Sequence, residues 1–136
     1  MIEITIVNQG GQLARVAGLL DRLGAEHHLA PEVLADMQVA LDEVLRNIMN
    51  YAYTDKAEHE IHIRLQVFDN VLDAVIEDDG APFDPLAIPA PDISKPQRER
   101  RVGGVGIHFV RNLMDEVAYN RAGERNRLVL RKRFKT

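Results

Sequence analysis

The spacing of apolar and polar positions along the chain predicts its strands and helices. Apolar and polar residues alternate over 2–7, 61–67 and 71–77, which is typical of half-buried strands. Apolar residues recur every three or four positions over 13–23 and in the long segment that begins at Pro31, which is typical of amphipathic helices. The first half of the chain therefore predicts a strand, two helices and two further strands.

The second half predicts one more helix and a final strand pair. A helix is expected to open at Gly103-Gly104-Val105-Gly106, and strands are expected over 116–119 and 127–134. The segment 81–102 holds five prolines and few core residues, and a long stretch without regular structure is often a functional lid. Strand pairs without intervening helices predict an α+β fold, a two-layer α/β sandwich in which helices cover one face of a mixed, mostly antiparallel sheet.

Composition narrows the class of protein. The 136 residues fit one domain, and 46% hydrophobic with 28% charged residues is globular composition. The net charge of −4 disfavours direct nucleic-acid binding. The chain has no cysteine, which excludes disulfides and thiolate metal sites. It shows neither a membrane-spanning apolar run nor a signal-peptide pattern, so we expect a cytoplasmic protein without membrane contact.

The long helix after Pro31 carries the first polar cluster. Glu43 and Asn47 are four residues apart and Asn50 follows three further on, so all three are expected on one stripe of the helix. A carboxylate and an amide oxygen at this spacing suit Mg²⁺, which prefers oxygen ligands and keeps several waters. The ordinary polar surface of a helix is the alternative interpretation.

The second cluster lies where the strand 71–79 ends. By the alternation of a strand, Asp78 continues its more uniformly apolar face. An ionised carboxylate is costly there unless a donor pairs with it, and a purine amino group is one suitable donor. Gly80, which lacks a side chain, would let a flat ring approach the backbone. A solvated Asp-Asp-Gly turn is the alternative, and a one-residue slip of the strand would favour it.

The third cluster is the glycine run 103–106 before a helix. Exposed N–H groups at the positive end of a helix dipole form a natural anion site. The run lacks the spacing of a Walker P-loop or a dinucleotide fingerprint. The preceding basic residues Arg98, Arg100 and Arg101 favour phosphate as the anion. A flexible hinge beside a solvated charge run is the alternative.

In this order, the three clusters resemble the motifs of the Bergerat-fold (GHKL) ATPases, the superfamily of gyrase, MutL, the heat-shock ATPases and histidine kinases. Segment 41–53 resembles the N box, 77–85 the first glycine box and 103–107 the second. Within the superfamily the chain is most similar to the anti-sigma-factor serine/threonine kinases, or anti-sigma regulatory factors. The likeness extends over nearly the whole chain and implies one histidine-kinase-like ATPase domain over 1–136, with an ATP lid at about 81–103.

The resemblance implies ATP and Mg²⁺ as cofactors and roles for individual residues. Glu43 would be the catalytic base or orient the attacking hydroxyl, Asn47 would coordinate Mg²⁺, and Asp78 would accept from the adenine amino group. The residues implied at the nucleotide are Asn47, Asn50, Asp78, Gly80, Phe83, Arg101, Gly103, Gly104, Val105, Gly106 and Ile107. Asn50 stands where many relatives carry histidine, and Pro82 replaces a glycine of the histidine kinases.

The same resemblance implies a regulator of transcription. Such a kinase sequesters a sigma factor and phosphorylates an anti-sigma factor antagonist, a STAS-type protein, on serine or threonine. A homodimer is expected from the family alone. Two alternatives stay open: a nucleotide-dependent binding module without catalysis, and the catalytic domain of a histidine kinase, which the strand close after Met1 disfavours.

Overall fold

The computed structural model describes residues 1–55, 57–84, 87 and 104–135. Its strands are β1 (Ile2–Val7), β2 (Glu60–Phe68), β3 (Val71–Asp78), β4 (Glu116–Ala122) and β5 (Arg125–Arg133). Its helices are α1 (Leu13–His27), α2 (Pro31–Asn47) and α3 (Gly104–Leu113), with a 3-10 turn η1 (Gly10–Gln12) and a π-helical turn η2 (Ile48–Ala52).

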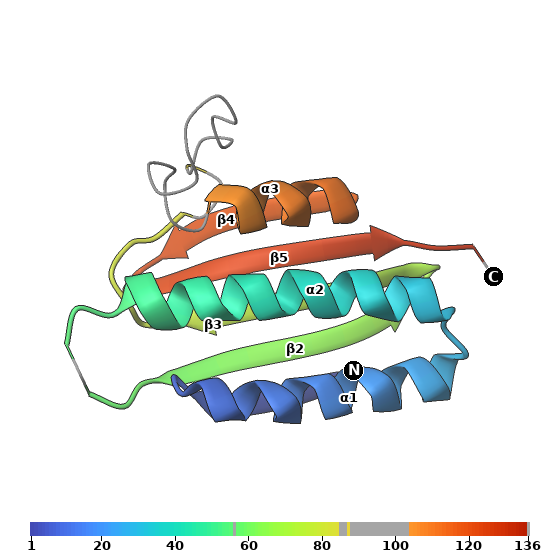
Figure 1. Ribbon diagram of the computed structural model, residues 1–136, viewed down its shortest axis with the longest axis horizontal. Coiled ribbons are helices and arrows are strands. Elements are labelled where there is room, and N and C mark those ends of the chain that lie inside the picture. Colours follow the sequence, from blue (N-terminus) through green and yellow to red (C-terminus); the bar gives the residue numbers. More distant parts are fainter. Residues whose placement is uncertain (56, 85–86, 88–103, 136) are drawn as a thin grey trace.

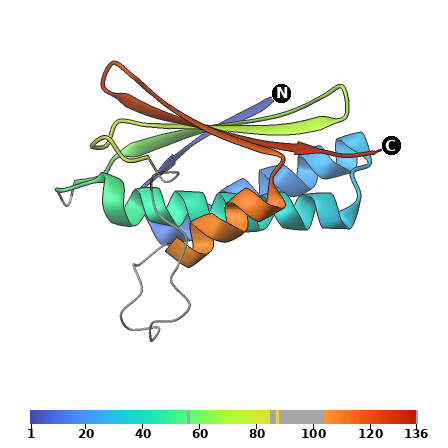
Figure 2. The ribbon, with the colours of Figure 1, turned by 90° about the horizontal axis from the view of Figure 1, so that it is seen from above.

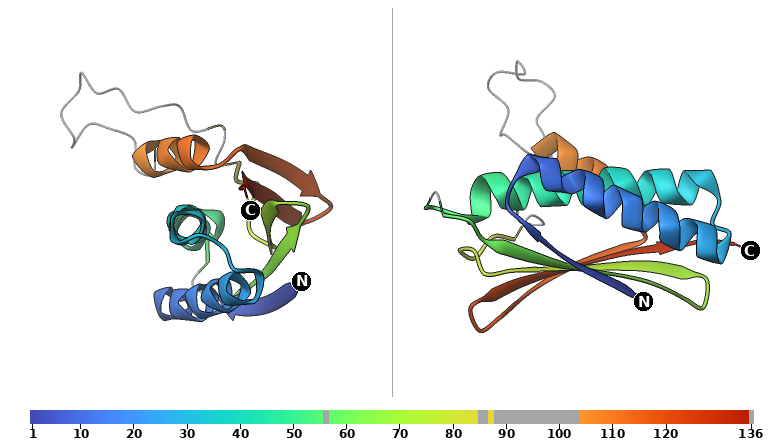
Figure 3. Two further views of the ribbon diagram at one scale, coloured as in Figure 1. Left: turned by 90° about the vertical axis from the view of Figure 1, so that its right-hand side faces the viewer. Right: turned by 90° about the horizontal axis from the view of Figure 1, so that it is seen from below.

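Within the described residues, the strands form one antiparallel sheet in the order β1-β2-β3-β5-β4. Helices α1, α2 and α3 lie on one face of this sheet, and the other face is open (Figure 1, Figure 2 and Figure 3). The predicted two-layer α+β sandwich is therefore confirmed. The strands β4 and β5 are longer than the pattern indicated, and α1 continues to His27. The predicted lid at 81–103 lies almost wholly outside the described residues.

A close helix contact and a left-handed residue shape the connection between α1 and α2. A Cβ atom added at Gly24 would lie 2.5 Å from Leu34 Cδ1, so the glycine allows α1 to approach α2. His28 follows α1 with φ 54°, and the Leu29 N–H donates to Gly24 O at 2.9 Å, which closes the helix end. Pro31 then begins α2 at the first helical position.

The turn between β2 and β3 fixes the register that positions the end of β3. Asp69 and Asn70 have φ of 51° and 61°, and two positive values in a two-residue loop are typical of a type I′ turn. The resulting register pairs Asp78 with Ile61 on β2 and with Asn126 on β5. The sequence Asp69-Asn70 between two alternating segments predicts such a tight turn, and the structure confirms it. The turn places Asp78 between two neighbouring strands.

The hydrophobic core lies between the sheet and α2. Its fully buried side chains include Leu20, Leu23, Met37, Leu41, Leu45, Leu65, Leu72, Ile76 and Leu130. The even positions of β3 face this core and the odd ones are partly exposed, as the alternation predicted. Among the described residues, no helix has the length and apolar character needed to cross a membrane.

Candidate functional site

Glu43 and Asn47 form a hydrogen-bonded pair on the last turns of α2. The Asn47 side chain is 3% exposed, and its Nδ2 donates to the Glu43 carbonyl oxygen at 2.8 Å and to Glu43 Oε1 at 2.9 Å. These bonds fix the orientation of the amide, because Nδ2 must face the two acceptors. The Asn47 Oδ1 atom is then the acceptor that this side chain can offer to a ligand.

The regular α-helix α2 ends at Asn47, and the π-helical turn η2 follows it directly. Asn50 lies in this turn and is exposed, whereas Asn47 is buried. Asn50, which was expected on one stripe with Glu43 and Asn47, thus follows them in a wider turn and differs from Asn47 in exposure. Ala52 ends the turn, and its carbonyl oxygen accepts from the Ala81 N–H at 2.7 Å. Single π turns inside helices are frequent at functional sites.

Asp78 is the buried acid at the end of β3, and its side chain lies on the helix-covered face with 1% exposure. Its Oδ1 accepts from the Gly80 N–H at 2.8 Å and from Asn126 Nδ2 at 3.0 Å. Burial raises the pKa of Asp78, and these two hydrogen bonds, with the nearby Arg121, oppose that rise. Both bonds from the described residues end on Oδ1, so Oδ2 is the oxygen that can accept from a ligand.

Asn126 was missed by the sequence reasoning, and it organises this part of the site. It is 3% exposed, and its Nδ2 also donates to Ala81 O at 2.9 Å. Its Oδ1 accepts from the Phe83 N–H at 3.3 Å and from the Tyr119 hydroxyl. Each polar atom of the amide is therefore used, and one side chain connects Asp78 with the start of the segment that was predicted as the lid.

Gly80 is needed for a protein contact. A Cβ atom added there would lie 2.6 Å from the Ala52 carbonyl oxygen and 2.8 Å from Ala52 Cβ. The Gly80 carbonyl oxygen accepts from Arg121 Nη1 at 2.7 Å. The missing side chain thus allows η2 to pack on the end of β3, which is a different reason from the approach of a flat ring; that approach stays a prediction.

Of the remaining predicted residues, some lie within the described part of the chain and others lie outside it. Phe83 is half-buried, and its ring lies 6.1 Å from that of Tyr51, centroid to centroid. Gly104, Val105 and Gly106 form the first residues of α3, and Ile107 follows with 2% exposure. Arg101 and Gly103 lie outside the described residues.

The described parts of the three predicted clusters lie at one end of the molecule. The end of α2, the end of β3 and the beginning of α3 lie at the same end of the sheet, on the left in Figure 1. Asn47 offers an amide oxygen, Asp78 a carboxylate oxygen, and α3 the positive end of a helix dipole. Such a set can bind a ligand that combines an amino-bearing ring with an anion.

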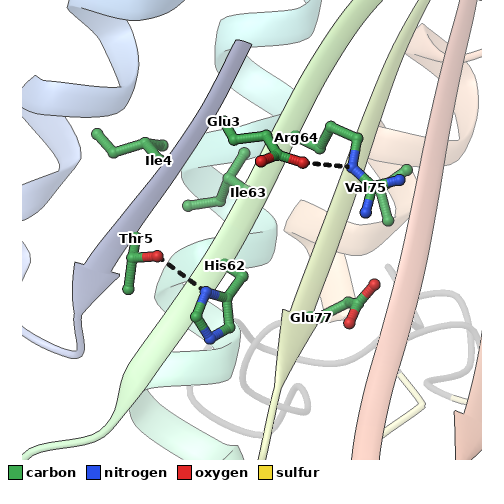
Figure 4. A pocket seen from close by; sticks show the side chains of 8 residues that line it. All are labelled: Glu3, Ile4, Thr5, His62, Ile63, Arg64, Val75 and Glu77. Carbon is green, nitrogen blue, oxygen red and sulfur yellow. Dashed lines mark hydrogen bonds and ion pairs between the residues drawn. The ribbon is translucent and has the colours of Figure 1, made fainter. Parts of the chain in front are cut away.

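A different pocket lies on the open face of the sheet, between β1, β2 and β3 (Figure 4). Its polar side chains already contact one another: Thr5 Oγ1 lies 2.8 Å from His62 Nδ1, and Arg64 Nε lies 3.2 Å from Glu3 Oε1. The buried acid and amide described above face the opposite side of the sheet. The candidate site is therefore the one at the ends of α2 and β3.

Fold and site together define a class of protein. The chain belongs to the histidine kinase-like ATPase domain family, whose model matches residues 6–132. It is similar to the serine-protein kinase RsbW of Oceanobacillus iheyensis, with 29% identity over 109 residues that cover 77% of this chain and 66% of that protein. It is also similar to the serine-protein kinase RsbW of Bacillus thuringiensis, with 30% identity over 106 residues, or 75% of this chain and 63% of that protein. The chain thus spans slightly less than two thirds of these relatives.

A solved structure supports the fold. The histidine kinase domain of the blue-light activated histidine kinase from Erythrobacter litoralis EL346 superposes with a TM-score of 0.54 and 18% identity. The superposition covers 91% of this chain and 60% of that one. The arrangement of sheet and helices is therefore shared with a histidine-kinase ATPase domain.

Proposed function

We propose that the chain binds ATP with Mg²⁺ and transfers the γ-phosphoryl group to a serine or threonine of a partner protein. The buried Asp78 carboxylate carries this proposal, because two protein hydrogen bonds hold one oxygen and no side chain or N–H of the described residues donates to the other. The family match and the names of the RsbW relatives support ATP and a protein substrate.

The geometry at Asp78 suits adenine. An exocyclic amino group can donate to Oδ2, whereas the O6 atom of guanine would place an acceptor against a carboxylate. Since Asn126 and the Gly80 N–H hold Oδ1, the carboxylate is already oriented before the base arrives. We therefore expect ATP to bind in preference to GTP.

The geometry at Asn47 suits Mg²⁺. The cation takes oxygen ligands, keeps several waters, and is commonly held by one or two protein oxygens together with substrate phosphates. Asn47 Oδ1 would be the protein ligand, oriented by the bonds from its Nδ2 to Glu43. When bound there, Mg²⁺ would neutralise charge on the phosphate oxygens.

Glu43 would act on the attacking hydroxyl. Its carboxylate would accept the hydroxyl proton while the serine oxygen bonds to the γ-phosphorus and the bond to the β-phosphate oxygen breaks, which leaves phosphoserine and ADP. The first N–H groups of α3 would bind the phosphates at the positive end of the helix. Catalysis would then rest on positioning and charge stabilisation.

The proposed protein substrate is an anti-sigma factor antagonist of the STAS type, and the proposed second partner is a sigma factor. Both follow from the likeness to anti-sigma-factor kinases and from the RsbW relatives. Sequestration of the sigma factor would be regulated by phosphorylation of the antagonist.

Phosphoryl transfer to a purified antagonist, with labelled ATP and Mg²⁺, tests this function. Glu43→Gln should abolish labelling and leave ATP affinity in calorimetry nearly unchanged. Asp42→Asn is the matched control, because Asp42 is also half-buried on α2 but, among the described residues, its partner is Gln38 Nε2 at 3.0 Å rather than Asn47. This control should label the antagonist at the wild-type rate.

The outcomes separate the possible functions. If the wild type bound ATP and the antagonist without labelling it, the chain would be a nucleotide-dependent binding module. Full labelling by Glu43→Gln would refute the role of Glu43 as the base. A wild type that bound no ATP would refute the proposed function as a whole.

A further inference from the structure

Lys132 occupies an unusual place among the basic residues of the C-terminal strand. By the alternation of β5, it shares the helix-covered face with the buried residues Asn126, Leu128 and Leu130. Arg131, its neighbour, lies on the open face. A charged side chain on the covered face requires partners, because burial without them is costly.

Lys132 has two partners on two different helices. Its Nζ donates to the carbonyl oxygen of Leu113, the last residue of α3, at 2.8 Å. The same Nζ lies 2.9 Å from Asp36 Oδ2 on α2. The Lys132 and Asp36 side chains are 21% and 32% exposed, so solvent screens this pair less than a fully exposed one. One ammonium group therefore joins β5, α2 and α3.

The contact with α3 has an electrostatic reason. The last carbonyl groups of a helix lack intrahelical partners and form the negative end of its dipole, where a cation is stabilising. Asp36 holds the ammonium from the other side and balances its charge. Lys132 is thus a cap for α3 that is fixed to α2.

These two helices carry the two halves of the proposed phosphate site. On α2, Glu43 follows Asp36 by about two turns, or roughly 10 Å, and Asn47 lies about one turn further on. The glycine-rich beginning of α3 lies nine residues from its capped end, about 14 Å along the helix. Figure 1 and Figure 3 show α2 and α3 side by side on the same face of the sheet. Because α3 is a single short helix, its capped end and its beginning are parts of one rigid element.

We propose that Lys132 is a positioning residue that holds α3 against α2, so that the beginning of α3 stays in place for the phosphates of ATP. This inference rests on the proposed function for its ligand, but the anchoring of α3 is independent of it. Lys132 touches neither nucleotide nor reacting atoms in this scheme; it acts through α3.

Arg131 provides a matched control on the same strand. Its Nε lies 3.3 Å from Asp73 Oδ1, and its Nη1 lies 3.1 Å from Glu116 Oε2, so it also has two partners. Those partners belong to β3 and β4, and neither is a helix. Arg131→Met removes as many contacts as Lys132→Met, but on the open face.

Hydrogen exchange of the nucleotide-free protein tests the anchor. In Lys132→Met the amides of α3 should exchange about five times faster than in the wild type, while those of β2 and β3 stay unchanged. Arg131→Met should leave α3 exchange at the wild-type rate. Unchanged α3 exchange in Lys132→Met would overturn the anchoring.

Calorimetry with ATP and Mg²⁺ tests the consequence for the ligand. Lys132→Met should weaken ATP binding about five- to tenfold, and Lys132→Arg should restore most of the loss because it keeps the cation. Asp36→Asn should give a smaller loss, and the double variant should bind no worse than Lys132→Met alone. Adenosine affinity should not change, because Asp78 is untouched.

The two measurements separate the possible failures. A wild type that binds no ATP would refute the proposed function, and α3 exchange would still decide the anchor. Equal ATP affinity in Lys132→Met and the wild type, or an equal loss in Arg131→Met, would overturn the positioning role. If Lys132→Met folds poorly, the milder Asp36→Asn variant provides the same comparison with a smaller expected loss, and Lys132→Arg remains the control that keeps the cation.

Discussion

The helix-covered face of the sheet and its open face both carry acidic residues, but the partners of these acids differ between the two faces. On the open face, acids pair across strands with arginines: Glu3 with Arg64, Asp73 with Arg131, and Glu77 with Arg127. On the covered face, Asp78 is held by an amide and a backbone N–H and has no arginine within ion-pair distance among the described residues.

The contrast shows which acids are available to a ligand. An exposed pair in which both charges are satisfied contributes little stability and offers little to a partner. A buried carboxylate whose charge is only partly compensated costs stability, and that cost is recovered when a donor arrives. Asp78 has this property, and Glu77, the preceding residue on the other face, does not. Substitutions on the two faces should therefore differ in kind.

The largest effect is expected at Asp78. Asp78→Asn keeps an oxygen for the Gly80 N–H and Asn126 Nδ2 but turns a donor toward the base, so ATP affinity should fall by about 3 kcal/mol, a hundredfold, in calorimetry. Glu77→Gln is the matched control and should bind ATP like the wild type. Equal affinities of Asp78→Asn and the wild type would refute the adenine role.

The same variant should not be less stable than the wild type. Burial raises the folded-state pKa of Asp78 above its ordinary value, so the folded chain binds the proton more tightly than the unfolded chain. The carboxylate therefore costs stability above its folded pKa. This cost decreases as the pH falls below the folded pKa and is gone below the unfolded pKa. Asp78→Asn removes this cost at neutral pH, and thermal unfolding should show an equal or higher Tm. A clearly lower Tm of Asp78→Asn would show that the ionised Asp78 carboxylate does not cost stability.

The next effect is expected at Asn126. Asn126→Leu leaves the Asp78 carboxylate, the Phe83 N–H and the Tyr119 hydroxyl without a shared partner, so unfolding free energy should fall by about 2 kcal/mol. Loss of the Asn126 donor should also raise the pKa of Asp78 further. As the pH is lowered, Asp78 should then become protonated, and ATP affinity should begin to fall, at a higher pH than in the wild type. Urea unfolding and calorimetry across pH measure both. An unchanged pH profile would show that Asn126 is structural alone.

The sequence predicted Asp78 but not Asn126, although both continue an apolar face. Asp78 follows a long, regular alternation on β3, so the sequence predicts which face of the sheet its side chain lies on. Asn126 precedes the apolar positions of β5 within a polar run, and the strand was expected to begin at 127. The sequence therefore did not show that the Asn126 side chain lies on the covered face of the sheet.

Other features depend on contacts between distant segments. The π turn after Asn47 has no pattern in the apolar spacing, and the sequence alone does not distinguish Lys132 from its basic neighbour Arg131. The order of elements, the hairpin turn and the antiparallel sheet followed from local patterns, because turn residues and periodicity act locally.

A smaller effect is expected on the open face. Arg127 Nε lies 3.6 Å from Glu77 Oε1, and both side chains are partly exposed. Arg127→Met should lower the unfolding free energy by about 0.5 kcal/mol in urea unfolding at low salt, and less at high salt. ATP affinity should stay at the wild-type value. A loss comparable to that of Asn126→Leu would contradict the distinction between the faces.

The smallest effect concerns Asp79, which follows Asp78 and has His59 as its partner. His59 Nδ1 lies 3.4 Å from Asp79 Oδ1, its Nε2 lies 2.7 Å from Asp55 Oδ1, and its ring stacks on Tyr53. The hydrogen bond with Asp55, followed by the charges of Asp55 and Asp79, raises the pKa of His59 against the opposing effect of desolvation.

A raised histidine pKa gives a definite pH dependence. The stabilisation from His59 is fully present below its unfolded pKa near 6.5 and is lost as the pH rises through the higher folded pKa. His59→Gln should therefore reduce the difference in urea midpoint between pH 6 and pH 8, and Asp55→Asn should do the same because it removes the largest cause. ATP affinity at pH 8 should hardly change in either variant, since Asp79 lies outside the set of groups that hold Asp78. If His59→Gln weakened ATP binding as much as Asp78→Asn, the two adjacent acids would belong to one site, and the separation between the faces would not hold at this end of β3.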